Sequence, residues 1–178
     1  MQNLHMYVPP RKQADGSLAF MLPCSKNTLV PAVDVHDIGG VVVGILNDIG
    51  RYNGQTIPIA SEWISMEKIA SDLAKVLGKA VSFNEITDQT AREIGMTEEF
   101  IQMFRAFENV GFFGKDCKNV SFDTTLELFR DIKTWPQYLV RRNAFFFIYL
   151  NSIHDIFLNS QASINPSYTF EKAILTHT

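Results

Sequence analysis

The chain has 178 residues, 46% of them hydrophobic and 20% charged, which is enough for one well-packed domain with an ordinary core. A formal net charge of −3 excludes the strongly basic surface that binds nucleic acids or anionic membranes, so we expect no direct contact with either. The two cysteines, Cys24 and Cys117, lack metal or redox spacing and are typical of reduced thiols. With no signal peptide and no bilayer-length apolar run, the sequence predicts a soluble, cytoplasmic protein, with the nucleus as an alternative location.

The first 33 residues predict one helix and two extended segments. Residues 1–8 have helical spacing, and Pro9-Pro10 ends that pattern. Leu18 to Leu22 (LAFML) is a short apolar strand, and Thr28 to Val33 runs extended into the next element.

The most strongly patterned helix follows this extended segment. Asp34 is an N-cap, and Asp37 can reach back to the amides of the first turn. Apolar residues recur at helical spacing from Val35 to Ile49, which predicts one buried face, and the helix ends at Gly50. This pattern predicts a fold element and no chemistry.

Three glycines in this helix invite a nucleotide-loop interpretation. The dinucleotide fingerprint needs G-x-G-x-x-G between a strand and a helix N-terminus, whereas Gly39, Gly40 and Gly44 have the spacing GGxxxG inside a helix. We therefore expect them to let another backbone pack closely against the helix.

A strand, a helix and a second strand are expected next. Gln55 to Ser61 (QTIPIAS) alternates like a strand. Ser65 caps a helix over Met66 to Leu77, and Gly78 is placed for its C-terminus. Lys79 to Ile86 alternates as a half-buried strand.

The remaining elements are helical. The expected segments are a short helix from Thr87 or Asp88 to Gly95, a helix over Glu98 to about Phe112 capped by Thr97, a weaker segment from Thr124 to Ile132, and a helix from Trp135 to about Arg142 that opens with the capping box of Thr134 and Gln137.

No residue has the setting of a catalytic or metal-binding group. Tyr168 and Lys172 have the Y-x-x-x-K spacing of hydride-transfer enzymes, but in a segment without a regular pattern. The adjacent pairs His36-Asp37 and His154-Asp155 do not face each other on a helix. The phenylalanines between Phe100 and Phe113 lack interleaved basic residues, so we interpret them as core or pocket wall.

Five motifs follow one another in an order that resembles the C-terminal half of NmrA-like proteins. They are V-D-V-x-D-I-G at 33–39, Y-N-G-x-T-I-P-I at 52–59, S-M-E-K-I-A with L-G-K-x-V-x-F at 65–83, M-F-R-x-F at 103–107 and T-W-x-x-Y-L at 134–139. NmrA-like proteins are atypical short-chain dehydrogenase/reductase relatives that include HSCARG-type NADP(H)-sensing proteins and a fungal nitrogen regulator.

The resemblance implies an α/β chain with an incomplete NAD(P)-binding Rossmann-like fold. Residues 1–142 correspond to its C-terminal part with a small α+β subdomain, and the dinucleotide-binding half would precede Met1. The opening Met1-Gln2-Asn3 resembles the end of the family's F-M-x-N segment near the nicotinamide, so Asn3 is the one cofactor-side position that carries over. Intact relatives bind NADP; this chain alone is expected neither to hold it tightly nor to be active.

The resemblance leaves three functions open. The leading one is a fragment of a redox sensor that regulates a protein partner. The alternatives are part of an NADP-dependent, isoflavone-reductase-like enzyme and a stand-alone protein-interaction module; the oligomeric state is left open. From Asn143 to Thr178 the composition changes, and we interpret this tail as a chain end outside the domain, with a partly ordered extension as the alternative.

Overall fold

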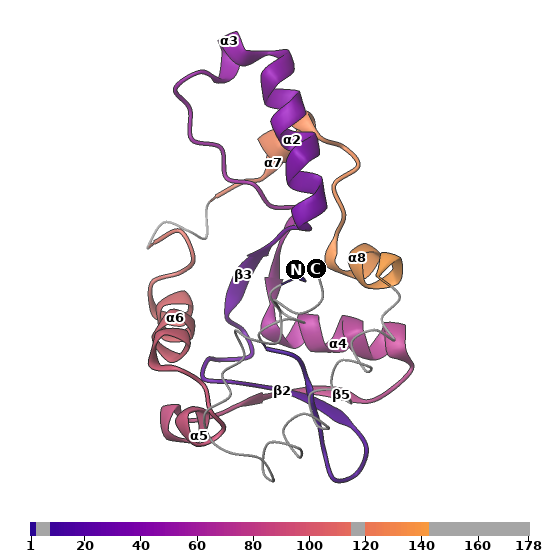
Figure 1. Cartoon of the computed structure of the whole chain (residues 1–178), viewed down its shortest axis with the longest axis vertical. Coiled ribbons are helices and arrows are strands. Elements are labelled where there is room, and N and C mark those ends of the chain that lie inside the picture. The colour runs from indigo at the N-terminus through magenta and orange to yellow at the C-terminus, as the bar shows by residue number, and fades with distance from the viewer. Residues whose placement is uncertain (3–7, 115–119, 143–178) are drawn as a thin grey trace, which may run out of the picture.

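Two small sheets and seven helices make up the part of the chain that the structure describes. The computed structural model describes residues 1–2, 8–114 and 120–142 (Figure 1). Helices and strands are combined in this part of the chain, with a parallel strand pair connected through helices, so the predicted α/β class is confirmed. Figure 1 shows α2 (Val35–Asn47) and the short α3 (Ile49–Tyr52) rising from one end of the molecule, away from β2 and β5 at the other end.

The larger sheet has the order β1-β2-β5, with β1 at Arg11–Lys12, β2 at Leu18–Leu22 and β5 at Val81–Glu85. β2 and β5 are parallel, with Leu18 opposite Val81 and Leu22 opposite Glu85. Four of the five residues of β2 are buried, which is typical of a central parallel strand and explains its unbroken apolar sequence. Both strands lie where the sequence predicted them.

The smaller sheet pairs β3 (Leu29–Ala32) with β4 (Glu62–Ser65) in antiparallel register. The predicted strand over Gln55–Ser61 is wrong, since none of these residues is in a strand and β4 begins only at Glu62. Pro58 has no N–H to donate to a ladder, and its carbonyl oxygen instead accepts a hydrogen bond of 2.7 Å from the Thr125 hydroxyl. This segment is therefore held by a distant side chain.

The helix α2 begins as predicted, because the Asp34 side chain accepts a hydrogen bond from the His36 amide. It ends at Asn47, however, and α3 follows as a separate helix, so the predicted continuous helix to Gly50 is wrong. The carboxylate of Asp37 does not reach back to the first turn. Its Oδ2 accepts a hydrogen bond of 2.7 Å from the Lys133 amide, which ties α2 to the chain before α8.

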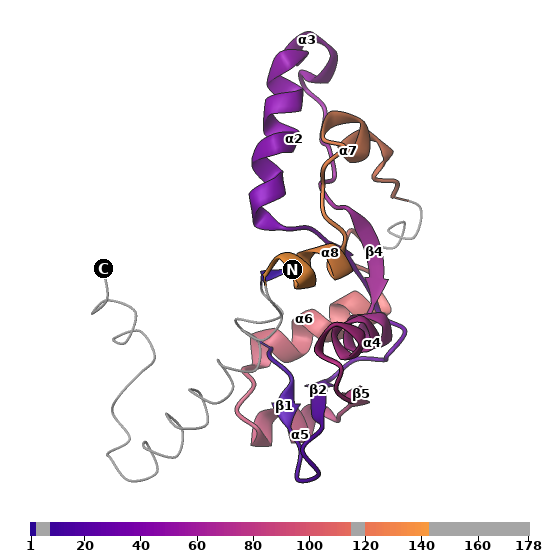
Figure 2. The same ribbon diagram turned by 90° about the vertical axis from the view of Figure 1, so that its right-hand side faces the viewer.

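The predicted buried face of α2 and α3 is largely exposed. Only Val41 among the apolar residues of α2 is buried, while Leu46 is 61% and Val43 is 56% exposed. The α2 stripe, as we call the exposed apolar set, consists of Val35, Val42, Val43, Leu46 and Ile49. Figure 2 shows α7 (Asp123–Leu128) beside α2 on one side, and no other described helix or strand lies along the opposite side.

Two of the three glycines of α2 let α7 and the residue after it approach closely. A Cβ at Gly44 would lie 2.6 Å from the carbonyl oxygen of Leu128, and one at Gly40 would lie 2.6 Å from the Phe129 ring. Nothing lies within 4 Å of a Cβ at Gly39. The prediction that these glycines let another backbone pack closely is confirmed at Gly44, whereas at Gly40 the close neighbour is a side-chain ring.

The helix α4 (Met66–Leu77) has the predicted bounds. The Ser65 hydroxyl accepts a hydrogen bond of 3.1 Å from the Lys68 amide, and Gly78 ends the helix with a φ of 61°. The other helices are α5 (Asp88–Glu93), α6 (Glu98–Asn109), α7 and α8 (Trp135–Arg141), which opens with the predicted capping box. α6 ends before the predicted Phe112.

The core lies where α4 and α8 meet the strands. Trp135 and Tyr138 of α8 are fully buried and stack with ring centroids 5.6 Å apart. The indole Nε1 of Trp135 donates a hydrogen bond of 3.2 Å to the carbonyl oxygen of Ile69. Within residues 1–2, 8–114 and 120–142, no helix is long and apolar enough to cross a membrane.

Candidate functional site

A cavity of about 530 Å³, which we call the central pocket, lies between the smaller sheet and α6. Its wall is almost entirely apolar. Residues from β3, β4, α4, α6 and α8 contribute to it, including Val30, Ile64, Met66, Met103, Phe104 and Trp135. A pocket with this lining suits an apolar or aromatic ligand more than a charged one.

The helix α6 supplies much of this wall. Phe100, Met103, Phe104 and Phe107 follow one another at intervals of three, one and three residues, so they share one face of the helix and all line the pocket. The interpretation of the phenylalanines as core or pocket wall is therefore confirmed for these positions. Methionine adds a flexible side chain that can adapt to different ligands.

The chain's first residues lie at this pocket and are fixed to the start of α2. Met1 lines the pocket, and its amino group donates a hydrogen bond of 2.8 Å to the Val33 carbonyl oxygen. Gln2 donates to Asp34 Oδ1 over 2.6 Å and accepts from the Val35 amide over 3.2 Å. The predicted cofactor-side residue Asn3 lies outside the described residues, and so does the predicted helix over most of residues 1–8.

Asp34 is the electrostatic centre of this junction. Its carboxylate is fully buried, caps α2 and forms an ion pair with Arg141 of α8. Burial alone would raise the pKa of Asp34, but the hydrogen bonds from the His36 amide and Gln2 and the charge of Arg141 together lower it. Burial also lowers the pKa of the Met1 amino group to about 6, against the opposing charge of Asp34.

The sequence predicted Asp34 only as a helix cap. Its ion pair with Arg141 joins residues 107 positions apart, and no local pattern indicates such a pairing. The junction therefore holds a buried carboxylate whose partners are already in place, which suits a structural role better than proton transfer.

The side chains of His36 and Asp37 point to different partners, as predicted for neighbours on a helix. The His36 ring is exposed, with Nε2 3.3 Å from Arg142 Nη2, and the neighbouring Asp37 carboxylate points to the Lys133 amide. The two neighbours therefore do not act as a pair. The other candidates, His154-Asp155 and Tyr168 with Lys172, lie outside the described residues.

No nucleophile or metal cluster stands out in the part of the chain that the structure covers. Burial raises the pKa of the Cys24 thiol to about 12, so this cysteine is a poor source of thiolate. Among the described residues, no group of three histidine, cysteine, aspartate or glutamate side chains could hold a metal ion.

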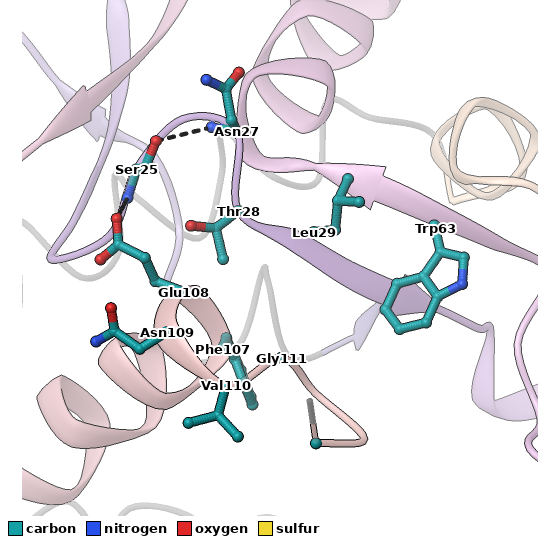
Figure 3. A pocket seen from close by; sticks show the side chains of 11 residues that line it. Ser25, Asn27, Thr28, Leu29, Trp63, Phe107, Glu108, Asn109, Val110 and Gly111 are labelled. Carbon is teal, nitrogen blue, oxygen red and sulfur yellow. Dashed lines mark hydrogen bonds between the residues drawn. The ribbon is translucent and has the colours of Figure 1, made fainter. Parts of the chain in front are cut away.

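A second pocket, of about 720 Å³, opens at the carboxyl end of α6 (Figure 3), and we call it the α6 groove. Its lining comes from the loop before β3, from Trp63 of β4 and from residues 107–111. Sequence reasoning missed it, because these three segments are far apart and none carries a motif.

The comparisons with known proteins can be set against this geometry. The model of the NmrA-like family matches residues 1–139. The chain belongs to the NmrA-like family. The resemblance to NmrA-like proteins that the five motifs indicated is thereby confirmed.

Solved structures share the fold at low sequence identity. NmrA, a negative transcriptional regulator crystallised with NAD, has a TM-score of 0.54 and 17% identity over 71% of this chain and 43% of its own. A triphenylmethane reductase from Citrobacter sp., complexed with NADP(H), has a TM-score of 0.53 and 15% identity over 69% and 44%. A nucleoside-diphosphate-sugar epimerase from Staphylococcus aureus has a TM-score of 0.54 and 14% identity over 68% and 43%.

This chain therefore spans less than half the length of the solved structures it matches, with part of their Rossmann-like fold. The family includes proteins that bind NAD or NADP. The described residues do not supply the loop for such a cofactor, because the glycines of α2 lie inside the helix and two of them are covered by α7 and Phe129. The glycines of α2 therefore fit the pyrophosphate of a dinucleotide poorly.

Proposed function

We propose that residues 1–142 form the carboxy-terminal part of an NmrA-like redox regulator, whose cofactor NADP(H) is held by a separate dinucleotide-binding half. The observation that carries the proposal is the exposed α2 stripe. In a water-soluble domain, apolar residues at this helical spacing are expected to pack against another protein surface. Burying one Val or Leu side chain there contributes roughly 1.5–3 kcal/mol to the stability of the contact.

The regulatory step follows from how two such halves would meet. The half that holds the cofactor would cover the α2 stripe, and Asn3 is the position proposed to face the nicotinamide. A change between NADP⁺ and NADPH would then alter the fit between the halves and the affinity for a regulatory protein partner. A cytoplasmic location, or a nuclear one, is part of the same proposal.

The cofactor part of the proposal is tested by calorimetry on the chain itself. Because the described residues lack a phosphate-binding loop, we expect no binding of NADPH or NADP⁺ in the micromolar range. Micromolar or tighter binding by this chain would show that it carries its own cofactor site, and the proposal would be abandoned.

The interface part is tested by light scattering as a function of concentration. We expect the chain alone to self-associate through the α2 stripe, and the double change of Val43→Glu and Leu46→Glu to abolish that association without lowering thermal stability. Val140→Glu, at an exposed apolar residue of α8, is the matched control and should change nothing. A monodisperse monomer, or equal behaviour of all variants, counts against an uncovered interface.

A second candidate function, a reductase, is favoured by the central pocket. Its apolar, aromatic wall and volume of about 530 Å³ suit an aromatic substrate. A longer protein containing both halves distinguishes the two functions. Oxidation of NADPH with an aromatic acceptor, followed by absorbance, indicates a reductase, whereas NADP(H)-dependent binding of a protein without turnover indicates a regulator.

A further inference from the structure

The α6 groove has two chemically different walls (Figure 3). Figure 3 shows Ser25, Asn27, Glu108 and Asn109 gathered on one side of the opening and Trp63 on the other. A pocket with this division suits a ligand that has one polar end and one apolar end.

The polar wall carries a negative charge. Glu108 is the one charged side chain among the lining residues that the structure describes. Its Oε1 accepts a hydrogen bond of 3.1 Å from the Ser25 amide, and its Oε2 lies 3.0 Å from Arg105 Nη1. Arg105 also pairs with Asp88, so a single guanidinium is shared by two carboxylates. This cluster has a net charge of −1.

The surrounding structure adds to this charge. The groove lies at the carboxyl end of α6, where the helix dipole places partial negative charge. Lys26, which lies between two lining residues in the sequence, pairs with Glu67 over 3.0 Å. Lys115 follows the lining residue Gly114 in the sequence and lies outside the described residues. Among the described residues, the charges at the groove therefore favour a cation over an anion.

The apolar wall is held rigidly. Trp63 Nε1 donates a hydrogen bond of 3.0 Å to the Val120 carbonyl oxygen, and the rings of Phe113 and Phe122 pack against the indole at centroid distances of 5.8 Å and 5.3 Å. Leu29, drawn between Thr28 and Trp63 in Figure 3, is exposed and offers apolar surface that a ligand can cover. Aromatic rings held in place also attract cations over their faces.

From these walls we infer that the α6 groove binds a small organic cation, a protonated amine attached to an apolar body. The ammonium group lies at Glu108, and the apolar body packs on Trp63 and Leu29. The site is distinct from that of a dinucleotide cofactor, because phosphates would be repelled by Glu108. It stands independently of the proposed NADP(H)-linked regulation.

The inference is tested with three probes of one shape and different charge. Titration of the whole chain with 2-phenylethylammonium, 2-phenylethanol and phenylacetate, followed by calorimetry and tryptophan fluorescence, compares the cation, the neutral analogue and the anion. We expect the cation to bind at least about tenfold more tightly than the alcohol, since hydrogen bonds to a charged group are the stronger ones, and phenylacetate to bind least. Equal affinity of cation and anion, or no binding of the cation at millimolar concentration, overturns the inference.

Variants then locate the binding. Glu108→Gln should remove most of the preference for the cation, while Glu93→Gln, at an exposed carboxylate of α5, is the matched control and should retain it. Asn109→Lys changes an exposed residue of the groove, so it tests the charge even if Glu108→Gln fails to fold. It should weaken binding of the cation and leave the alcohol unaffected. A cation affinity unchanged in Asn109→Lys places the ligand elsewhere and refutes the inference.

Discussion

Adding one methyl group at Gly44 tests the contact between α2 and α7 directly. The Cβ of an alanine there would lie 2.6 Å from the carbonyl oxygen of Leu128, far inside ordinary contact distance. This oxygen belongs to the backbone, so α7 must move as a whole to make room. At Gly39, on the same helix, nothing lies within 4 Å of the corresponding Cβ, which makes Gly39→Ala the matched control.

Two opposing contributions set the change in the free energy of unfolding. Replacing glycine by alanine inside a helix stabilises it by about 1 kcal/mol, and this term is common to both variants. Overpacking at Gly44 costs about 1–3 kcal/mol. Gly39→Ala should therefore raise the free energy of unfolding by about 1 kcal/mol, and Gly44→Ala should be about 1–3 kcal/mol less stable than Gly39→Ala. Gly40→Ala should fall between them, because its obstacle is the Phe129 ring, which can rotate.

Urea denaturation followed by circular dichroism measures these differences, and a thermal scan should show them as roughly 2–4 °C per kcal/mol for a domain of this size. Equal stabilisation by Gly39→Ala and Gly44→Ala would refute the reasoning, since it would mean that α7 does not pack on α2 at Gly44. A change in the urea m-value for one variant would point instead to a change in the unfolded state.

Three further predictions rest on single side chains. Because the pKa of Asp34 is lowered in the folded protein, its charge stabilises the fold above a pH of about 4, and this stabilisation is lost as the pH falls through the folded-state pKa. In urea titrations, Asp34→Asn should be less stable than the unchanged protein by about 1 kcal/mol or more near neutral pH, and this difference in stability should disappear in acid. A difference in stability that is independent of pH contradicts the role of the carboxylate. Burial raises the pKa of the Cys24 thiol to about 12, so in a Cys117→Ser protein this thiol should resist iodoacetamide near pH 8 and react once urea unfolds the chain. Mass spectrometry measures the labelling. Rapid labelling of Cys24 in the folded protein would contradict its burial. Ser65→Ala should cost about 1 kcal/mol through the lost cap of α4, and an unchanged urea midpoint would show that the cap contributes nothing.

The features predicted best from the sequence are those whose cause lies within one helical turn. Ser65 caps α4 through an amide three residues away, and Gly78 ends it through its own φ of 61°. Thr134 and Gln137 close the capping box of α8 in the same local way. Such contacts are encoded by residue type and spacing alone, which is why the bounds of α4 were predicted correctly.

The errors concern contacts made over long distances in the chain. Alternation in Gln55–Ser61 is compatible with a strand, but Pro58 is held by Thr125, 67 residues away, and no ladder forms. In α2 the periodicity predicted one buried face, whereas Val41 is buried and Val42 and Leu46 are exposed. It could not show whether anything covers that face, because periodicity records only the arrangement along the helix.

The two pockets differ in how much the sequence could say about them. The central pocket draws several of its residues from one face of α6, so the spacing from Phe100 to Phe107 already indicated a wall. The α6 groove combines Thr28, Trp63 and Glu108 from three elements, and each residue looks ordinary in its own segment. Only the folded chain brings the indole and the carboxylate around one opening.

The contacts at the base and on one side of α2 also determine what its stripe can do. Asp34 fixes the first turn to Gln2 and α8, and Gly40 and Gly44 hold α7 against one side of the helix. By the 3.6-residue repeat, Val42 and Leu46 fall on the opposite side of the helix from these glycines. The stripe is therefore presented by a helix whose position is already fixed, so docking would order little further structure on this side, and less of the free energy of apolar burial would be lost to ordering. A rigid surface of this kind favours a second folded body over a flexible peptide.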